Sequence, residues 1–177
     1  MLFHETPLSG AFVIEPERVE DERGFFARSW CRREFAERGL TPDFIQSNIS
    51  FNRLRGTVRG MHYQLRPYGE TKLVRCTMGE IYDVIVDMRP ASTTYRQWFS
   101  VELSAQNRRM LYIPEMFAHG FQTLTDSAEV FYQMAGEYHP TSSAGFRWND
   151  AAIGVRWPLD VGVISKRDAE WPALAER

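Results

Sequence analysis

Short stretches in which apolar and polar residues alternate recur along the middle of the chain. Turn-forming residues separate seven of them: 57–64, 72–77, 81–88, 98–103, 109–113, 120–124 and 129–134. A period of two is typical of β-strands, and closely spaced strands without intervening helical patterns indicate an antiparallel sandwich or barrel. Asp126-Ser127 predicts a tight hairpin between the last two stretches. The pattern therefore predicts an all-β fold.

Helical patterns are confined to short segments near the two ends of the chain. Residues 32–38, followed by Gly39, predict about two helical turns with a glycine stop. Residues 168–175 predict a short C-terminal helix, and Ser165 is typical of a helix N-cap or a turn. Residues up to about Ser50 are less periodic and more charged, which indicates an arm that covers the barrel or reaches a partner subunit.

The stretch 81–88 combines polar and apolar residues on one of its faces. The face that begins at Tyr82 carries only packing residues, whereas the other alternates Ile81 and Ile85 with Asp83 and Asp87. Two interpretations are open. The mixed face is either a partly exposed sheet surface or a barrel interior in which Asp83 hydrogen-bonds a polar residue of a site.

The composition is that of one globular domain. The 177 residues are 44% hydrophobic and fall within the roughly 100–200 residues of a typical domain, so we expect a single domain over 1–177. The chain has 21 Lys and Arg against 23 Asp and Glu, a net charge of −2. This balance gives no global attraction to nucleic acid or to an anionic membrane surface, and is compatible with a local basic pocket for a small anion.

Targeting and redox signals are also weak. No apolar run reaches the roughly 18–20 residues of a membrane span, and the first residues lack the pattern of a secretory signal. Cys31 and Cys76 are isolated thiols without metal-site or redox-motif spacing. We therefore expect a reduced, soluble cytoplasmic protein that spans no membrane.

Two of the four histidines lie beside glycines in strand-like runs, where a ligand can approach the backbone closely. They are His62 in 59–64 and His119 in 114–120. Barrels of the cupin type carry a metal on motifs that resemble H-x-H…E and P-x-G-x-x-H; here Gln64 replaces the second histidine and Met116 the usual glycine. A lone histidine in a strand is more often structural. Two in these positions, with the metal set incomplete, favour a base over a ligand.

The three-residue spacing of Arg59 and His62 leaves two geometries open. A regular strand would point them to opposite faces, whereas a bulge at Gly60 would bring both to one side. Lys72 is either a solvent-reaching lysine or a buried cation for a developing oxyanion. Tyr132 taken alone is typical of a core tyrosine. None of these residues identifies a function by itself.

Together the motifs resemble the dTDP-4-dehydrorhamnose 3,5-epimerase family of deoxysugar-nucleotide epimerases. The resemblance extends over nearly the whole chain, and the ordered set of motifs is specific although each is weak alone. It is carried by Asp21-Glu22-Arg23-Gly24-Phe25-Phe26, 46–50, 59–64, 72–75, 83–89, 113–121, Tyr132, Tyr138, Trp148-Asn149-Asp150, Trp157-Pro158 and 165–168. It implies a cupin-like β-barrel (jelly roll) with an N-terminal arm and a few short helices.

The resemblance also implies an isomerase that uses no cofactor and no metal. Its reaction removes a carbon-bound proton next to the C4 ketone of a nucleotide-linked 4-keto-6-deoxyhexose and returns it on the other face, at C3, at C5 or at both. His62 would be the base, Asp168 would orient it, Lys72 would stabilise the enolate and Tyr132 would supply the returning proton. His119, supported by Asp83, would hold the sugar.

The nucleotide contacts implied by the resemblance involve a second set of residues. Arg23 and Arg59 suit the diphosphate, because guanidinium groups match phosphate oxygens. Gln46 and Asn48 correspond to polar substrate contacts, and Tyr138 to an aromatic ring that stacks on the base. The N-terminal arm of such proteins crosses between subunits, which implies a homodimer.

Three departures from the family pattern leave the substrate open. Arg28 and Ser143 stand where glutamates are usual, and Arg167 replaces a lysine. The favoured substrate is dTDP-4-dehydro-6-deoxy-D-glucose, epimerised at C3 and C5. Epimerisation at one carbon only, or of a CDP- or GDP-linked 4-keto sugar, is the alternative. A metal-dependent cupin enzyme and a non-catalytic sugar-nucleotide binding module are alternatives of a different class.

Overall fold

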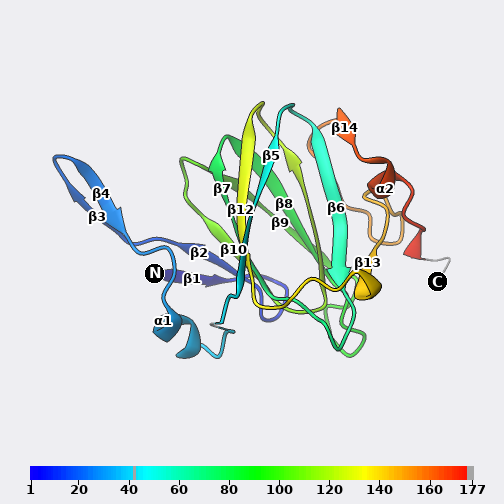
Figure 1. Cartoon of the computed structure of the whole chain (residues 1–177), viewed down its shortest axis with the longest axis horizontal. Helices are drawn as coiled ribbons and strands as arrows, with labels where there is room; N and C mark the ends of the chain where they lie inside the picture. The colour runs from blue at the N-terminus through cyan, green and yellow to red at the C-terminus, as the bar shows by residue number, and fades with distance from the viewer. Residues whose placement is uncertain (42, 175–177) are drawn as a thin grey trace.

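Two antiparallel sheets pack against each other in the computed structural model, which describes residues 1–41 and 43–174 (Figure 1). The first sheet has the order β1 (Leu2–Glu5), β2 (Phe12–Glu15), β10 (Met110–Ile113), β7 (Lys72–Met78), β12 (Ala128–Met134) and β5 (Gln46–Asn52). The second has the order β13 (Ser143–Gly145), β6 (Thr57–Gln64), β11 (Phe117–Thr123), β8 (Glu80–Asp87) and β9 (Trp98–Ser104), and β14 (Val163–Ile164) pairs with β6 in parallel. The predicted all-β fold is confirmed, and all seven predicted strands are present.

The main core lies between the two sheets and follows the alternation along each strand. On β7, Val74 and Cys76 point into this core, whereas Leu73 lies on the outer face, where it packs with Phe35. The second sheet contributes Ile85 and Phe121, among others, to the same core. A strand with both faces covered is nearly apolar throughout. Polar residues on the inner faces therefore need an explanation.

The mixed face of β8 is a barrel interior, as the second of the two interpretations held. Asp83 and Asp87 are fully buried. Asp87 accepts hydrogen bonds from Arg89, Ser92 and Thr94 and so closes the loop that follows β8. Burial would raise the pKa of Asp87, but these bonds lower it to about 2. Asp87 is thus accounted for by the fold, and Asp83 belongs to the site described below.

The hairpin predicted at Asp126-Ser127 is wrong. The two strands that it joins lie in different sheets, because β11 pairs with β6 and β8 whereas β12 pairs with β5 and β7. The connection crosses from one sheet to the other, and Asp126 accepts a hydrogen bond from the backbone N–H of Arg55 at 2.7 Å. Turn residues mark where the chain reverses and carry no information on which sheet it enters next.

The N-terminal arm has two parts with different placements. β1 and β2 extend the first sheet beside β10, and α1 (Arg32–Ala36) covers its outer face through Phe35. The predicted helix 32–38 is thus present, two residues shorter than expected. The hairpin of β3 (Arg18–Asp21) and β4 (Gly24–Ala27) instead projects away from both sheets (Figure 1). The expectation that the arm covers the barrel is confirmed for β1, β2 and α1.

The C-terminal segment runs back along β6. A 3-10 turn, η1 (Pro140–Ser142), precedes β13, and the last α-helix within the described residues is α2 (Lys166–Ala169). The helix predicted at 168–175 begins two residues earlier and is shorter. The predicted N-cap at Ser165 is confirmed, since its side chain accepts from the N–H of Asp168, and α2 ends before Pro172. Ala175 lies outside the described residues. Within the described part of the chain, no helix is long and apolar enough to cross a membrane.

Candidate active site

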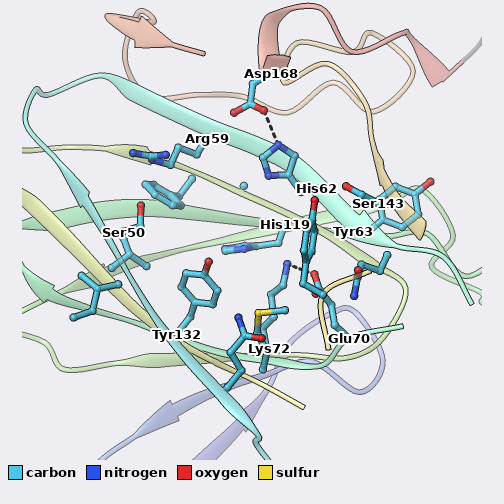
Figure 2. A pocket seen from close by; sticks show the side chains of 18 of the residues that line it. Ser50, Arg59, His62, Tyr63, Glu70, Lys72, His119, Tyr132, Ser143 and Asp168 are labelled. Carbon is cyan, nitrogen blue, oxygen red and sulfur yellow. Dashed lines mark hydrogen bonds and ion pairs between the residues drawn. The ribbon is translucent and has the colours of Figure 1, made fainter. Parts of the chain in front are cut away.

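A cavity of about 470 Å³ opens between the two sheets (Figure 2). Its walls come from β5, β7 and β12 on one side and from β6 and β11 on the other, with α2 at the rim. The polar lining residues are Gln46, Ser50, Arg59, His62, Tyr63, Gln64, Glu70, Lys72, His119, Tyr132, Tyr138, Ser143, Arg167 and Asp168. Of the eleven candidates taken from the sequence, eight line this cavity: Gln46, Arg59, His62, Lys72, His119, Tyr132, Tyr138 and Asp168.

A bulge in β6 gives Arg59 and His62 a common face. Opposite them on β11 stand Phe121 and His119, which are two residues apart, whereas Arg59 and His62 are three apart. The extra residue lies at Gly60-Met61, as the bulge hypothesis required. Gly60 has a φ of 125°, and a Cβ there would lie 2.5 Å from the Cα of Gly120. Only glycine fits this position, and the bulge directs both polar side chains into the cavity.

His62 and Asp168 form a hydrogen-bonded pair on one wall. Nε2 of His62 lies 2.6 Å from Oδ1 of Asp168, and the N–H of Gly60 donates to the other carboxylate oxygen. Burial would raise the pKa of Asp168, but the hydrogen bond and charge of His62, with help from Gly60 and Ser165, hold it below its usual value. The second ring nitrogen, Nδ1, is left to take a proton (Figure 2).

Tyr132 and Lys72 stand on the opposite wall, on the neighbouring strands β12 and β7. The ammonium of Lys72 lies 2.6 Å from the carboxylate of Glu70, and both side chains are about nine-tenths buried. Burial raises the pKa of Tyr132, the charge of Glu70 raises it further, and Arg59 opposes both. The Tyr132 hydroxyl therefore keeps its proton at neutral pH and is available as an acid.

His119 forms a second histidine–carboxylate pair deeper in the same cavity. Its Nε2 lies 2.7 Å from Oδ1 of Asp83, which is fully buried on β8. The predicted contact between these two residues is therefore present. Only 11% of the His119 side chain is exposed, against 38% for His62.

The remaining polar candidates lie beside opposite ends of β5 or at the cavity rim. Arg59 donates to the side chain of Asn52, the last residue of β5, whereas Gln46, its first residue, donates to Asn48. Asn48 itself is not among the residues that line the cavity. The ring of Tyr138 is half exposed at the rim, where a flat ligand can stack on it.

The structure does not bring Arg23 to the cavity of its own chain. Arg23 lies at the turn of the projecting β3–β4 hairpin, with 86% of its side chain exposed, and pairs with Asp21. Arg28, one of the departures, pairs with Glu34 beside α1. A sequence motif shows that a residue belongs to a pattern, and does not show where the fold places its side chain.

Several lining residues had no place among the sequence candidates for catalysis or binding, and the contacts of two of them, Glu70 and Gln64, bear on the site. Glu70 was missed, although an acidic residue two positions before Lys72 in an extended segment shares its face. Gln64, which replaces a metal-ligand histidine in the cupin pattern, instead bonds the backbone of Tyr68, Glu137 and His139 and so ties two loops together at the cavity mouth.

The other two residues that differ from the family pattern, Ser143 and Arg167, contact each other at the cavity rim. Arg167 donates to the hydroxyl of Ser143 at 2.9 Å. Among the described residues, no three His, Cys, Asp or Glu side chains are grouped so that they would hold a metal ion.

Comparison with known proteins decides the family. The sequence model of the dTDP-4-dehydrorhamnose 3,5-epimerase family matches residues 5–176. The chain belongs to the dTDP-4-dehydrorhamnose 3,5-epimerase family. A curated 3,5-epimerase of this family from Methanothermobacter thermautotrophicus is 45% identical over 98% of this chain and 95% of its own length.

Solved structures of the dTDP-4-dehydrorhamnose 3,5-epimerase family share the fold over the whole chain. The enzyme from Elizabethkingia anophelis superposes with a TM-score of 0.97 at 35% identity, covering 100% of this chain and 98% of its own. The enzyme from Bacillus anthracis, solved with TDP and pyrophosphate bound, has a TM-score of 0.94 at 39% identity and covers 98% and 99%. These matches confirm the family, the cupin-like fold and the epimerase class of activity predicted from the sequence.

Proposed function

We propose that this protein epimerises dTDP-4-dehydro-6-deoxy-D-glucose at C3 and C5, with His62 as the base and Tyr132 as the acid. The observation that carries the assignment of roles is the placement of these two groups on facing walls of one cavity. Inversion of a carbon centre requires the proton to leave on one face of the sugar ring and to return on the other. A base and an acid on opposite walls satisfy this requirement when the ring lies between them.

Proton removal from C3 or C5 leaves negative charge on the C4 oxygen of the enolate. The Lys72 ammonium stabilises this charge in a water-poor site, where such a contact is stronger than in water. Asp168 fixes the tautomer of His62, so that Nδ1 accepts the proton, and stabilises the imidazolium that forms. Tyr132 then donates its proton to the opposite face of the carbon. Exchange with solvent returns the lost proton to Tyr132 and removes the gained one from His62.

The nucleotide lies at the mouth of the cavity. Arg59 binds the diphosphate, Gln46, positioned by Asn48, makes a polar contact to the substrate, and the ring of Tyr138 stacks on the base. The TDP and pyrophosphate bound to the Bacillus anthracis relative support a thymidine nucleotide as the preferred carrier. We place the protein in the cytoplasm, where nucleotide sugars are made, and treat residues 1–177 as one domain because the family model spans 5–176.

A homodimer completes the diphosphate site in this proposal. Arg23 lies on a hairpin that projects away from its own sheets, and Val19 and Phe26 on that hairpin are 68% and 76% exposed. A partner subunit would cover these apolar residues and receive Arg23. Mixing Arg23→Ala with His62→Ala chains tests this: a mixed dimer has one complete site and regains activity, whereas two independent chains stay inactive.

The catalytic proposal is tested by incubating dTDP-4-dehydro-6-deoxy-D-glucose with the purified protein in D₂O. NMR and mass spectrometry then locate the deuterium. Label at both C3 and C5, with inversion, is the expected result. Label at C3 alone or C5 alone would make the protein a mono-epimerase with the same chemistry. No label from folded protein, followed by label with a CDP- or GDP-linked sugar, would overturn the choice of nucleotide.

A further inference from the structure

Glu70 is a buried carboxylate that the catalytic steps above leave without a role. It lies immediately before β7 and is 8% exposed. One oxygen contacts the Lys72 ammonium at 2.6 Å, and the other is buried without a hydrogen-bond partner among the described residues. A buried charge is costly unless its surroundings compensate for it. Retaining an ionic group that is only half satisfied therefore calls for an explanation in terms of the site.

The segment that carries Glu70 is held firmly against the end of β12. The N–H of Ala135 donates to the carbonyl of Thr71 at 2.9 Å, and a Cβ at Gly136 would lie 2.9 Å from the carbonyl oxygen of Gly69. Glu70 and Lys72 point into the same cavity as Tyr132 (Figure 2). The carboxylate is therefore fixed relative to two of the groups that act on the substrate.

The charge balance of the cavity makes Glu70 distinctive. Among the described lining residues, Glu70 and Asp168 are the only carboxylates, and Asp168 is engaged by His62. The charged and titratable groups that share the cavity with Tyr132 come from several elements. They are Lys72 on its neighbouring strand β7, Glu70 before that strand, Arg59, His62 and Tyr63 on β6, His119 on β11, Tyr138 after β12, and Arg167 and Asp168 on α2. β5 contributes the neutral Gln46 and Asn48. Glu70 is thus the anion that offsets the surrounding cations on the wall of the acid.

We propose that Glu70 is a positioning residue that acts through Lys72 and Tyr132. It fixes the ammonium where the enolate charge develops, and it places a negative charge in the same cavity as the phenol that donates the proton. A negative neighbour disfavours tyrosinate, so Glu70 preserves the acid for its step. This inference rests on the proposed roles of Lys72 and Tyr132.

Glu70→Gln is the decisive variant, because it keeps the shape and an oxygen acceptor for Lys72 while it removes the charge. Glu137→Gln is the matched control: it makes the same chemical change at the cavity mouth, on a side chain that is 79% exposed. The Tyr132 titration is followed by tyrosinate absorbance, as the difference between each protein and the same protein carrying Tyr132→Phe. This readout needs neither substrate nor activity.

In Glu70→Gln we expect the Tyr132 titration to move to lower pH by about one unit. We also expect kcat to fall about tenfold, its alkaline limb to move in the same direction, and KM to stay within about twofold. Glu137→Gln should change none of these. Glu70→Asp keeps the negative charge, so its Tyr132 titration should stay close to that of the parent protein. It serves as the second variant if Glu70→Gln unfolds.

An unmoved Tyr132 titration in folded Glu70→Gln would overturn the inference, as would equal shifts in Glu70→Gln and Glu137→Gln. If the parent protein failed to epimerise, the proposed function would fall. The tyrosinate titration would still report whether Glu70 and Tyr132 are coupled.

Discussion

Two histidine–carboxylate pairs stand side by side in this protein, with almost the same geometry and different surroundings. His62 and His119 are register partners on β6 and β11, and their Nε2 atoms lie 2.6 and 2.7 Å from Asp168 and Asp83. The His62 side chain is 38% exposed to the cavity, whereas that of His119 is 11% exposed. Asp168 sits on a short terminal helix, whereas Asp83 lies in the middle of a core strand.

The difference shows that a histidine–carboxylate contact does not by itself identify a base. A base has to reach the carbon that loses the proton and must then exchange that proton with solvent. His62 lines the cavity and is the more exposed of the two histidines, which suits it to this role. His119, more deeply enclosed and backed by a fully buried carboxylate, is better suited to hold a substrate oxygen in place.

The largest effect should separate the two histidines. We expect His62→Ala to lower the rate of substrate deuterium exchange by roughly 10⁴-fold, since the base is lost. His119→Ala should retain an exchange rate at least tenfold higher than that of His62→Ala. Its main effect should be on KM, because the base and the acid remain. Exchange measured by NMR in D₂O checks both. Equal losses in kcat from the two variants would remove the distinction between the pairs.

Substitution of the carboxylate should likewise lower kcat more in the His62 pair than in the His119 pair. Asp168→Asn should lower kcat by about 10²-fold, because an amide cannot stabilise the imidazolium and favours the wrong tautomer of His62. Asp83→Asn should have a smaller effect on kcat. Steady-state kinetics with the same substrate provide the comparison, and a larger kcat loss from Asp83→Asn would reverse the assignment of the base.

Stability should respond in the opposite order. Asp83→Asn should reduce the free energy of unfolding by about 2 kcal/mol, because a group in the core loses a charge-assisted hydrogen bond. Asp168→Asn should reduce the free energy of unfolding by less, because His62 remains partly hydrated. Urea denaturation at neutral pH measures both values. A greater loss for Asp168→Asn would show that the terminal helix, and not β8, anchors the structure.

The smallest effect concerns pH. The pKa of Asp168 is lower in the folded chain than its ordinary value of 3.8, so its carboxylate contributes stability that is fully present above that value. The contribution is lost as the pH falls through the folded pKa. The Tm difference between the parent and Asp168→Asn should therefore be positive at pH 6 and shrink progressively as the pH falls below 3.8. A difference that grew on acidification would contradict the direction of the shift.

The central strands could be predicted from the sequence because their burial imposes a visible alternation. β6, β7 and β8 carry apolar residues at most of their buried positions. β5 was missed because its inward positions, Gln46, Asn48 and Ser50, are polar, so the strand resembles a loop; Gln46 and Ser50 line the cavity. Functional polarity thus concealed the strand that forms one wall of the site.

The candidate site was only partly accessible from local patterns. The bulge at Gly60 could be anticipated from spacing, and the Glu70–Lys72 pair follows from two-residue spacing in an extended segment. The contact of His62 with Asp168 joins residues 106 positions apart, and only the family resemblance indicated it. Arg23 lies on a hairpin that projects away from both sheets, a placement that no local sequence pattern specifies.

The most direct test of opposed proton transfer is the fate of the substrate with Tyr132→Phe in D₂O. This variant keeps His62, Asp168 and Lys72, so proton removal and return on the side of the base should continue. The expected product is the starting sugar carrying deuterium with its configuration retained at the exchanged carbon, and inversion slowed by about 10²-fold. Inversion at the parent rate would contradict the assignment of Tyr132 as the acid on the facing wall.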